Sequence, residues 1–431
     1  MFESVLVANR GEIASRVIRT VRAMGLKAIA VYSDADADLP FVAEADDAVA
    51  LGGAAPARSY LHQDAILEAA LRSNAQAIHP GYGFLAENAG FARRVIEAGL
   101  VWIGPDPATI DAMGDKIRAR NLMEAAGVPV AAGTRAPVAT VGDAVVAAAG
   151  LGYPLMVKAA AGGGGIGIGV AFDETALVRG FDNARADAER LFGSPDLLLE
   201  RYLEGARHVE IQILGLADGT VLALGERDCS VQRRYQKVVE ETPSPGVSPD
   251  LRARMLAAAV RAGEAVAYRG AGTVECLVDP VRQDFVFLEM NTSLQAEHTV
   301  TELVTRIDLV EQQLLIAAGE PVSFRAVEIG GHAIEFRVYA EDAESFLPGP
   351  GQIKIWIEPE GEDIRVDAGY AEGNTVTSFY DPLMAKLCVF GVDRPAALTR
   401  AGEAAAAFHI EGPRSNLPFL TELLGDREFA A

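Results

Sequence analysis

The sequence predicts an α/β and α+β protein built from several subdomains. Residues 4–8 (SVLVA) form a short apolar run, an amphipathic segment follows and ends at Gly25, and residues 27–34 (KAIAVYSD) read as a second strand. This order is a βαβ unit. Residues 332–340 and 351–358 alternate with period two, which predicts a sheet near the end of the chain. A chain of 431 residues exceeds one ordinary core, so we expect two to four subdomains.

The remaining elements follow from the same patterns, taken in chain order. Short apolar runs predict strands, and amphipathic or alanine-rich segments predict helices. We expect strands within 75–80, 101–105, 155–160, 208–214, 220–228, 272–278 and 285–291, and helices within 106–130, 250–268, 297–318 and 394–408.

Composition and charge exclude several classes of function. The net charge is −22, which opposes a nucleic-acid or anionic-membrane partner, because binding a polyanion needs an excess of cations. Three scattered cysteines without a CxxC pair argue against a metal–thiolate site or a disulfide framework. The first residues lack a secretory pattern, and no apolar run is long enough to span a bilayer. We therefore expect a cytoplasmic protein.

The first βα turn distinguishes two nucleotide-binding classes. A nicotinamide or flavin enzyme would carry G-x-G-x-x-G here, and the turn holds only Gly11. Asp34 at the end of the second strand is weak support by itself, because acidic residues often end strands. The dinucleotide alternative is therefore the less favoured one.

A run of four glycines, 162–165, follows the apolar strand that contains Lys158. Glycine allows the backbone N–H groups to approach a phosphate closely, although no G-K-[ST] follows and the run is not a Walker loop. A flexible hairpin is the alternative. An unpaired lysine inside an apolar strand is costly, so we expect a ligand phosphate as the partner of Lys158, in preference to a structural salt bridge.

Residues 226–241 (ERDCSVQRRYQKVVEE) concentrate cations in an otherwise acidic chain. Such a run is usually a solvated face. Here it follows an apolar strand and is interleaved with glutamine and tyrosine, so we also consider an anion site formed by Arg227, Arg233, Arg234 and Lys237.

The stretch 287–302 (FLEMNTSLQAEHTVTE) carries polar groups two residues apart where a core strand should be apolar. Residues 272–278 and 285–291 are joined by a turn-rich link and should form a hairpin. If Leu277 lies opposite Phe287, then Glu275 faces Glu289. Two facing carboxylates repel unless a cation lies between them, and Asn291 adds a third oxygen on the same face. We expect Mg²⁺ there; a protonated carboxyl or a shifted register is the alternative.

These motifs together resemble the biotin carboxylase family of the ATP-grasp superfamily, over nearly the whole chain. The resemblance rests on VANRGEIA, AIHPGYGFLAEN, MGDK, VKAAAGGGG, RHVEIQ, ERDCSVQRRYQKVVEE, YRGAGTVE, EMNTSLQAEH and FYDPLMAKL. It implies a Rossmann-like N-terminal domain (1–112), a helical linker (113–130), a mobile glycine-rich lid (131–204), a catalytic ATP-grasp part (205–330) and a C-terminal mixed-sheet domain (331–431). ATP would lie between the lid and the catalytic part.

The resemblance also implies roles for individual residues. ATP would be held by Lys116, Lys158, Gly163, Gly164, Gly165, Glu200, Leu203, His208, Gln232, Glu275 and Glu289. The metal ligands would be Glu275, Glu289 and Asn291, for Mg²⁺ with Mn²⁺ as the alternative ion. The bicarbonate and biotin site would contain Lys237, Ser293, Gln295, Ala296, Glu297 and Arg337, with Glu297 as the general base and Arg337 beside biotin.

The implied reaction is an ATP-dependent carboxylation. A base deprotonates bicarbonate, bicarbonate attacks the γ-phosphate, and the resulting carboxyphosphate releases CO₂ beside biotin. The chain has no A-M-K-M biotinylation motif, so biotin would arrive on a carrier protein that works with carboxyltransferase subunits. A homodimer is implied as well: Arg19 and Arg365 match the family's subunit contact, whereas Ala23 and Glu362 do not.

The chain departs from the family pattern near the substrate anions. Ser293 and Ala296 replace an arginine and a valine, Tyr235 replaces a histidine, and Ile166 follows the glycines where the family has lysine or arginine. Serine cannot clamp an anion bidentately as arginine does. Three hypotheses follow. The first is a working biotin carboxylase subunit of an acyl-CoA carboxylase, in which Lys237 and Arg337 compensate for the missing arginine. The others are an ATP-grasp ligase that passes its activated carboxylate to a different acceptor, and a non-catalytic nucleotide-binding relative. The retained metal and ATP residues argue against the third, and the first is favoured.

Overall fold

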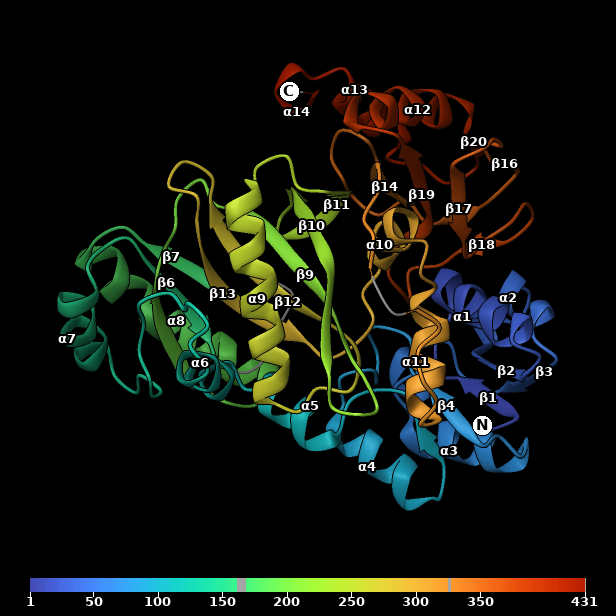
Figure 1. Cartoon of the computed structure of the whole chain (residues 1–431), viewed down its shortest axis with the longest axis horizontal. Coiled ribbons are helices and arrows are strands. Elements are labelled where there is room, and N and C mark those ends of the chain that lie inside the picture. The colour runs from blue at the N-terminus through green and yellow to red at the C-terminus, as the bar shows by residue number, and fades with distance from the viewer. Residues whose placement is uncertain (161–167, 325–326, 431) are drawn as a thin grey trace.

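The computed structural model describes residues 1–160, 168–324 and 327–430 (Figure 1). At the N-terminal end, a parallel sheet has the order β3-β2-β1-β4-β5. Alternate residues of its strands face opposite layers: Val5 packs in the cluster that contains Val17 of α1, and Leu6 packs with Ile66 and Phe91 of α3 and α4. The predicted βαβ unit is confirmed. Its elements are β1 (Ser4–Val7), α1 (Gly11–Ala23), β2 (Lys27–Tyr32), α2 (Pro40–Glu44), β3 (Asp47–Ala50), α3 (Gln63–Arg72), β4 (Ala77–His79), α4 (Ala89–Glu97) and β5 (Val101–Trp102).

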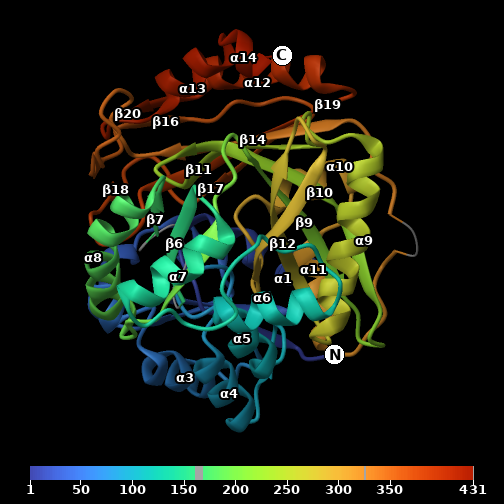
Figure 2. The ribbon, with the colours of Figure 1, turned by 90° about the vertical axis from the view of Figure 1, so that its left-hand side faces the viewer.

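A small three-stranded sheet with two helices forms a separate layer, which Figure 2 shows facing the viewer. Its strands have the order β7-β6-β8, and its core packs Leu155 and Leu199 of the sheet against Leu177 and Phe181 of α8. The predicted glycine flap at 163–165 lies outside the described residues. The elements of this layer are α7 (Val141–Leu151), β6 (Leu155–Ala159), β7 (Ile168–Ala171), α8 (Glu174–Phe192) and β8 (Leu197–Arg201).

A single eight-stranded sheet forms the centre of the molecule, in the order β13-β12-β9-β10-β11-β14-β19-β17. Helix α9 (Pro249–Ala265) packs along β9 and β10 (Figure 1). The sheet continues through the boundary that we expected near residue 330, because β14 pairs directly with β11. Its strands are β9 (Arg207–Gly215), β10 (Val221–Arg233), β11 (Gln236–Thr242), β12 (Gly270–Asp279), β13 (Asp284–Asn291), β14 (His332–Tyr339), β17 (Ile364–Ala368) and β19 (Leu383–Gly391).

Two predicted helices are each divided in two. The predicted helix within 106–130 is divided into α5 (Pro107–Gly114) and α6 (Lys116–Ala125). Asp115 caps α6, because its side chain accepts hydrogen bonds from the backbone N–H groups of Ile117 and Arg118. The predicted helix 297–318 breaks at Arg306, whose φ is 59°, into α10 (His298–Thr305) and α11 (Leu309–Ala317).

The C-terminal end adds helices and short strands around the far part of the large sheet (Figure 1). The predicted helix within 394–408 is confirmed as α12 (Arg394–Ala407). Within the described ranges, no helix is both long and apolar enough to cross a membrane. The remaining elements are β15 (Gly351–Gln352), β16 (Ile355–Ile357), β18 (Thr375–Val376), β20 (His409–Glu411), α13 (Leu417–Leu424) and α14 (Arg427–Ala430).

Candidate active site

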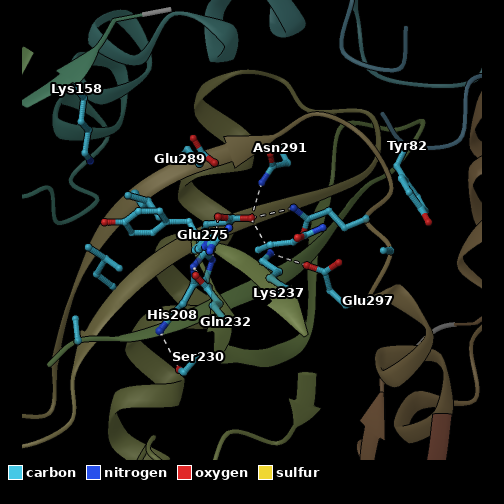
Figure 3. Close-up of a pocket in the computed structure, with 18 of the residues that line it drawn as sticks. Tyr82, Lys158, His208, Ser230, Gln232, Lys237, Glu275, Glu289, Asn291 and Glu297 are labelled. Atoms are coloured by element: carbon cyan, nitrogen blue, oxygen red, sulfur yellow. Dashed lines mark hydrogen bonds and ion pairs between the residues drawn. The ribbon is translucent and has the colours of Figure 1, made fainter. Parts of the chain in front are cut away.

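A cavity of about 910 Å³ lies where the small layer, the central sheet and the loop after β4 meet (Figure 3). Lys158 of β6 lies at one end of the view and Tyr82 at the other. Of the predicted residues, Glu200 does not line the cavity, and the three loop glycines lie outside the described residues. Those that do line it are Lys116, Lys158, Leu203, His208, Gln232, Lys237, Glu275, Glu289, Asn291, Ser293, Gln295, Ala296, Glu297 and Arg337.

The hairpin of β12 and β13 brings two carboxylates together. Glu275 pairs with Glu289 across the strands, as predicted, and Thr273 pairs with Asn291. The expected pairing of Leu277 with Phe287 is wrong, because Phe287 pairs with Cys276. A β-bulge between Glu275 and Cys276 shifts the register by one residue, so the carboxylate pair marks the point where regular pairing is interrupted.

The two facing carboxylates have different surroundings. Glu275 Oε1 accepts hydrogen bonds from Lys237 Nζ, Asn291 Nδ2 and Gln295 Nε2 at 3.0, 2.7 and 2.9 Å. Burial raises the pKa of Glu275, but Lys237 and His208 outweigh it and hold that pKa well below its usual range.

Glu289 has no hydrogen bond or ion pair within the part of the chain that the structure describes. Burial and the charge of Glu275 raise its pKa. The charges of Lys116 and Lys158 oppose this rise in pKa, so Glu289 is a cavity-facing carboxylate near two lysines. Together with Glu275 and the side-chain oxygen of Asn291, it offers the hard oxygen donors that Mg²⁺ prefers, so these three residues fit the ion.

Lys237 is the centre of a second charged cluster. Its Nζ lies 2.6 Å from Glu210, 3.0 Å from Glu275 and 2.5 Å from Glu297, as the dashed lines to Glu275 and Glu297 show in Figure 3. Only 12% of its side chain is exposed. Three carboxylates thus converge on one ammonium group, and removing that group would leave them to repel one another.

Glu297 is held in its ionised form. Burial raises its pKa, but Lys237, Arg337 and Arg227 outweigh this and place the pKa far below the usual range of a glutamate. The Nη2 atom of Arg337 donates to Glu297 Oε2 at 2.8 Å, and its Nε donates to Glu240 at 2.7 Å. Glu297 is therefore ionised but only weakly basic. Its pKa rises, and it becomes a useful base, only when its cationic partners turn toward another anion.

The partner of Lys158 differs from our expectation. Lys158 Nζ forms a short ion pair with Glu200 on the neighbouring strand β8, so the structural salt bridge that we favoured less is present. Its side chain still lines the cavity. Lys116, at the first turn of α6, lines the cavity as well, and burial lowers its pKa. Two lysines from different elements therefore converge at this end of the cavity.

The predicted anion site in residues 226–241 is wrong for Arg227 and Arg233, which do not line the cavity. Arg227 is fully buried and donates to Glu210 and Gln212, both at 2.6 Å. These hydrogen bonds connect β10 to β9, so Arg227 has a structural role. Arg233 pairs with Glu341 at 2.9 Å. Only Arg234 and Lys237 of the four cations line the cavity, with Arg234 at the tip of the β10–β11 hairpin.

Ser293 contacts a carboxylate that sequence reasoning missed. Its Oγ donates to Glu87 Oε1 at 2.9 Å, and the backbone N–H of Thr292 donates to the same oxygen at 2.9 Å. Desolvation raises the pKa of Glu87, and Glu289 contributes to this rise. Glu87 is part of the quoted motif AIHPGYGFLAEN, and its charge after an apolar stretch was the available signal.

Tyr82 and Glu210 were missed as well. Tyr82 lies in the same motif and lines the cavity. Glu210 lies on the polar face of β9, which alternates with the apolar face formed by Val209 and Ile211, and it bonds both Arg227 and Lys237. A buried carboxylate in a strand needs a cation, so its position in RHVEIQ could have indicated that partner.

Comparison with known proteins identifies the family. Residues 1–110 match "Biotin carboxylase, N-terminal domain", residues 115–325 match "Carbamoyl-phosphate synthase L chain, ATP binding domain", and residues 335–431 match "Biotin carboxylase C-terminal domain". The chain is 49% identical over 433 residues to a biotin carboxylase of Halalkalibacterium halodurans, which covers 100% of this chain and 96% of that protein.

Solved structures agree with this. The chain superposes with a TM-score of 0.97 and 39% identity on a biotin carboxylase–β,γ-ATP complex from Campylobacter jejuni, covering 100% of this chain and 96% of that one. It superposes with a TM-score of 0.96 and 42% identity on the biotin carboxylase domain dimer of Hydrogenobacter thermophilus 2-oxoglutarate carboxylase, solved with MgADP, ADP and bicarbonate, covering 100% and 95%. The fold is the ATP-grasp fold, and the chain belongs to the biotin carboxylase family, whose members are ATP-dependent ligases.

Proposed function

We propose that this protein carboxylates biotin on a separate carrier protein, with ATP and bicarbonate as co-substrates. One observation carries the proposal: a single cavity holds two lysines, a set of oxygen donors for a divalent ion, and the cluster of Lys237, Glu297 and Arg337. Phosphoryl transfer needs the first two, and activation of a small anion beside an acceptor needs the third.

The end of the cavity with Lys116 and Lys158 would receive the phosphates of ATP. The ammonium groups supply positive charge where negative charge develops on the transferred phosphoryl group. Gly163, Gly164 and Gly165 would close over the phosphates. Leu203, His208 and Gln232 would line the adenosine side, and Glu200 would orient Lys158 through their ion pair. Glu275, Glu289 and Asn291 would hold Mg²⁺, which when bound screens the phosphate charges.

Bicarbonate would bind at the Lys237 cluster. Its negative charge would draw Lys237 and Arg337 from Glu297, and the pKa of Glu297 would rise toward the range of a useful base. Glu297 would then take the bicarbonate proton while a bicarbonate oxygen attacks the γ-phosphorus and ADP leaves. The products are carboxyphosphate and ADP. Gln295 and the backbone of Ala296 would orient the anion, and Ser293 would leave room that the family fills with arginine.

Biotin would lie beside Arg337, at the end of the cavity near Tyr82. Carboxyphosphate breaks down to CO₂ and trivalent phosphate, the phosphate takes the proton of the ureido N–H, and the nitrogen attacks CO₂. Arg337 would stabilise the negative charge on the ureido oxygen during this step. Atoms and charges balance, because the proton leaves as hydrogen phosphate and the new bond is carbon–nitrogen.

A biotinylated carrier and carboxyltransferase subunits would be the partners, and the three unpaired cysteines are consistent with a cytoplasmic setting. We propose a homodimer as in the family, although Arg19 and Arg365 both bond Asp367 within the chain, at 2.7 Å each. Sedimentation of the protein over a range of concentrations tests this directly.

The test is ATP hydrolysis in Mg²⁺ with and without bicarbonate and free biotin, followed by isolation of acid-labile carboxybiotin from ¹⁴C-bicarbonate. We expect hydrolysis that depends on bicarbonate, rises with biotin and yields labelled product. ATP binding with no label transferred to biotin would contradict the proposal and direct the search to other acceptors.

A further inference from the structure

Two motifs outside the proposed reaction meet behind the active site. Glu12 belongs to VANRGEIA at the start of the chain, and Lys386 belongs to FYDPLMAKL near its end. The structure brings Lys386 Nζ to 3.2 Å from Glu12 Oε2 and 2.8 Å from the carbonyl oxygen of Ala296. Lys386 is 0% exposed and Glu12 is 4% exposed. A lysine is rarely placed in such surroundings without a specific partner.

The position of the Ala296 carbonyl is the important feature. This carbonyl belongs to the peptide group that joins Ala296 to Glu297, so the hydrogen bond from Lys386 fixes the plane from which Glu297 projects. Glu297 itself precedes α10 and is directed at Lys237 and Arg337. A rotation of this peptide group would move the carboxylate away from both cations.

The other end of the same chain of contacts also reaches the cavity. Glu12 Oε1 accepts a short hydrogen bond from the hydroxyl of Tyr82, which lines the cavity. Asn9, three residues earlier, holds the backbone carbonyls of Pro80 and Tyr82 at 2.7 Å each. Figure 3 shows Tyr82 and Glu297 toward the same side of the pocket. Glu12 and Lys386, which do not line the cavity themselves, thus connect the hydroxyl of Tyr82 to the peptide group that carries Glu297.

The charge arrangement explains why a neutral residue would not serve equally well. Lys386 lies directly opposite Arg337 on the paired strands β19 and β14, so two cations share one face of the sheet. Like charges in that position repel unless anions separate them. Arg337 has Glu240 and Glu297, whereas Lys386 has Glu12, with Asp367 at 3.9 Å. The charges of Glu12, Glu335 and Asp367 together raise the pKa of Lys386 against the effect of burial, and Glu12 is the carboxylate nearest to its ammonium group.

We propose that Glu12 and Lys386 are positioning residues: the buried Glu12–Lys386 pair fixes the Ala296–Glu297 peptide group and the Tyr82 hydroxyl, and thereby aligns the base with the acceptor end of the cavity. The proposal rests on the proposed function for its kinetic consequences alone. The structural consequence, an ordered segment 291–297, does not depend on which reaction the site performs.

The test compares Lys386→Met and Glu12→Gln with a matched control, Arg394→Met. Arg394, the first residue of α12, forms an ion pair at 2.7 Å with the buried Glu241 on β11 of the same sheet and does not line the cavity. Hydrogen–deuterium exchange of the full chain should be about tenfold faster in the peptide containing 291–297 for Lys386→Met, but unchanged there for Arg394→Met. Equal exchange in wild type and Lys386→Met would overturn the proposal.

Kinetics give the second readout. We expect bicarbonate-dependent ATP hydrolysis to fall about 10–100-fold in Lys386→Met with the ATP KM within about twofold, because misplacement of the base affects the chemical step. Glu12→Gln should lose less. The double variant should be no worse than Lys386→Met, since a glutamine oxygen can still accept the hydrogen bond of Tyr82 and the remaining effect of Glu12 acts through Lys386. Additive losses, or losses that follow thermal stability as in Arg394→Met, would refute the positioning role.

If Lys386→Met does not fold, Glu12→Gln, which keeps the shape of the side chain, carries both measurements. A wild-type protein that shows no carboxylation would defeat the proposed function and leave the exchange experiment to judge the positioning role.

Discussion

Replacing Lys237 by methionine should separate electrostatic from steric contributions at the centre of the site. The change removes an ammonium group that lies 2.5–3.0 Å from Glu210, Glu275 and Glu297. Breaking a buried ion pair by removing one partner costs about 3–5 kcal/mol. Each carboxylate keeps another donor, so we expect the lower end of this range, about 3 kcal/mol, near pH 8.

The pH dependence of that loss has a definite sign. Lys237 lowers the pKa values of Glu275 and Glu297, so without it these carboxylates take up protons at higher pH in the folded protein. Protonation removes their mutual repulsion. The difference in the free energy of unfolding between wild type and Lys237→Met should therefore be largest near pH 8 and shrink near pH 5.5.

The assay is urea unfolding at both pH values, with bicarbonate-dependent ATP hydrolysis measured alongside, which we expect to fall about 10²–10³-fold. Lys27→Met is the matched control, because Lys27 pairs with Asp47 at 3.0 Å on the surface and should cost less than about 1 kcal/mol at either pH. A loss in Lys237→Met that is independent of pH, or no larger than the control, would refute the reasoning.

Three further changes have distinct expected results. Glu289→Gln should raise the Mg²⁺ concentration for half-maximal ATP hydrolysis about tenfold or more. It should not destabilise the free protein, since Glu289 forms no hydrogen bond or ion pair in the described part of the chain. Unchanged Mg²⁺ dependence in a titration would exclude Glu289 as a ligand. Ser293→Arg should pair with Glu87 and lower the bicarbonate KM by less than about tenfold, and a large gain would mean that Lys237 and Arg337 do not compensate. Asp115→Ala should cost about 1 kcal/mol in urea unfolding through loss of the cap on α6 and raise the ATP KM through Lys116, whereas an unchanged ATP KM would argue against a phosphate role for that lysine.

Sequence patterns within single strands and helices predicted the features of the fold that depend on neighbouring residues. Alternation with period two correctly predicted the faces on which Glu275 and Glu289 lie, because side-chain direction in a strand follows parity along the chain. Their direct opposition also depends on the register, which the prediction bases on a Leu277–Phe287 pair that the structure does not contain. The β-bulge beside this pair could not be predicted, since an extra residue changes the register without a local signature such as glycine. The same holds for the break at Arg306, a non-glycine residue with positive φ.

Long-range pairing explains the other differences. Lys158 and Glu200 lie on strands 42 positions apart, so no spacing rule could join them. Likewise, the continuity of β11 with β14 joins two segments that appear separate along the chain. The contact between Glu12 and Lys386 spans most of the sequence, and only the folded structure shows that two motifs without an assigned role meet behind Glu297.

The central claim is that bicarbonate is activated by phosphorylation in this cavity. It can be tested by following oxygen from ¹⁸O-bicarbonate into inorganic phosphate during turnover with ATP, Mg²⁺ and biotin. Attack by a bicarbonate oxygen on the γ-phosphorus predicts one labelled oxygen in each phosphate released by the wild type, and severely reduced labelling in Glu297→Gln. Phosphate released without label would mean that water is the nucleophile and would contradict the account.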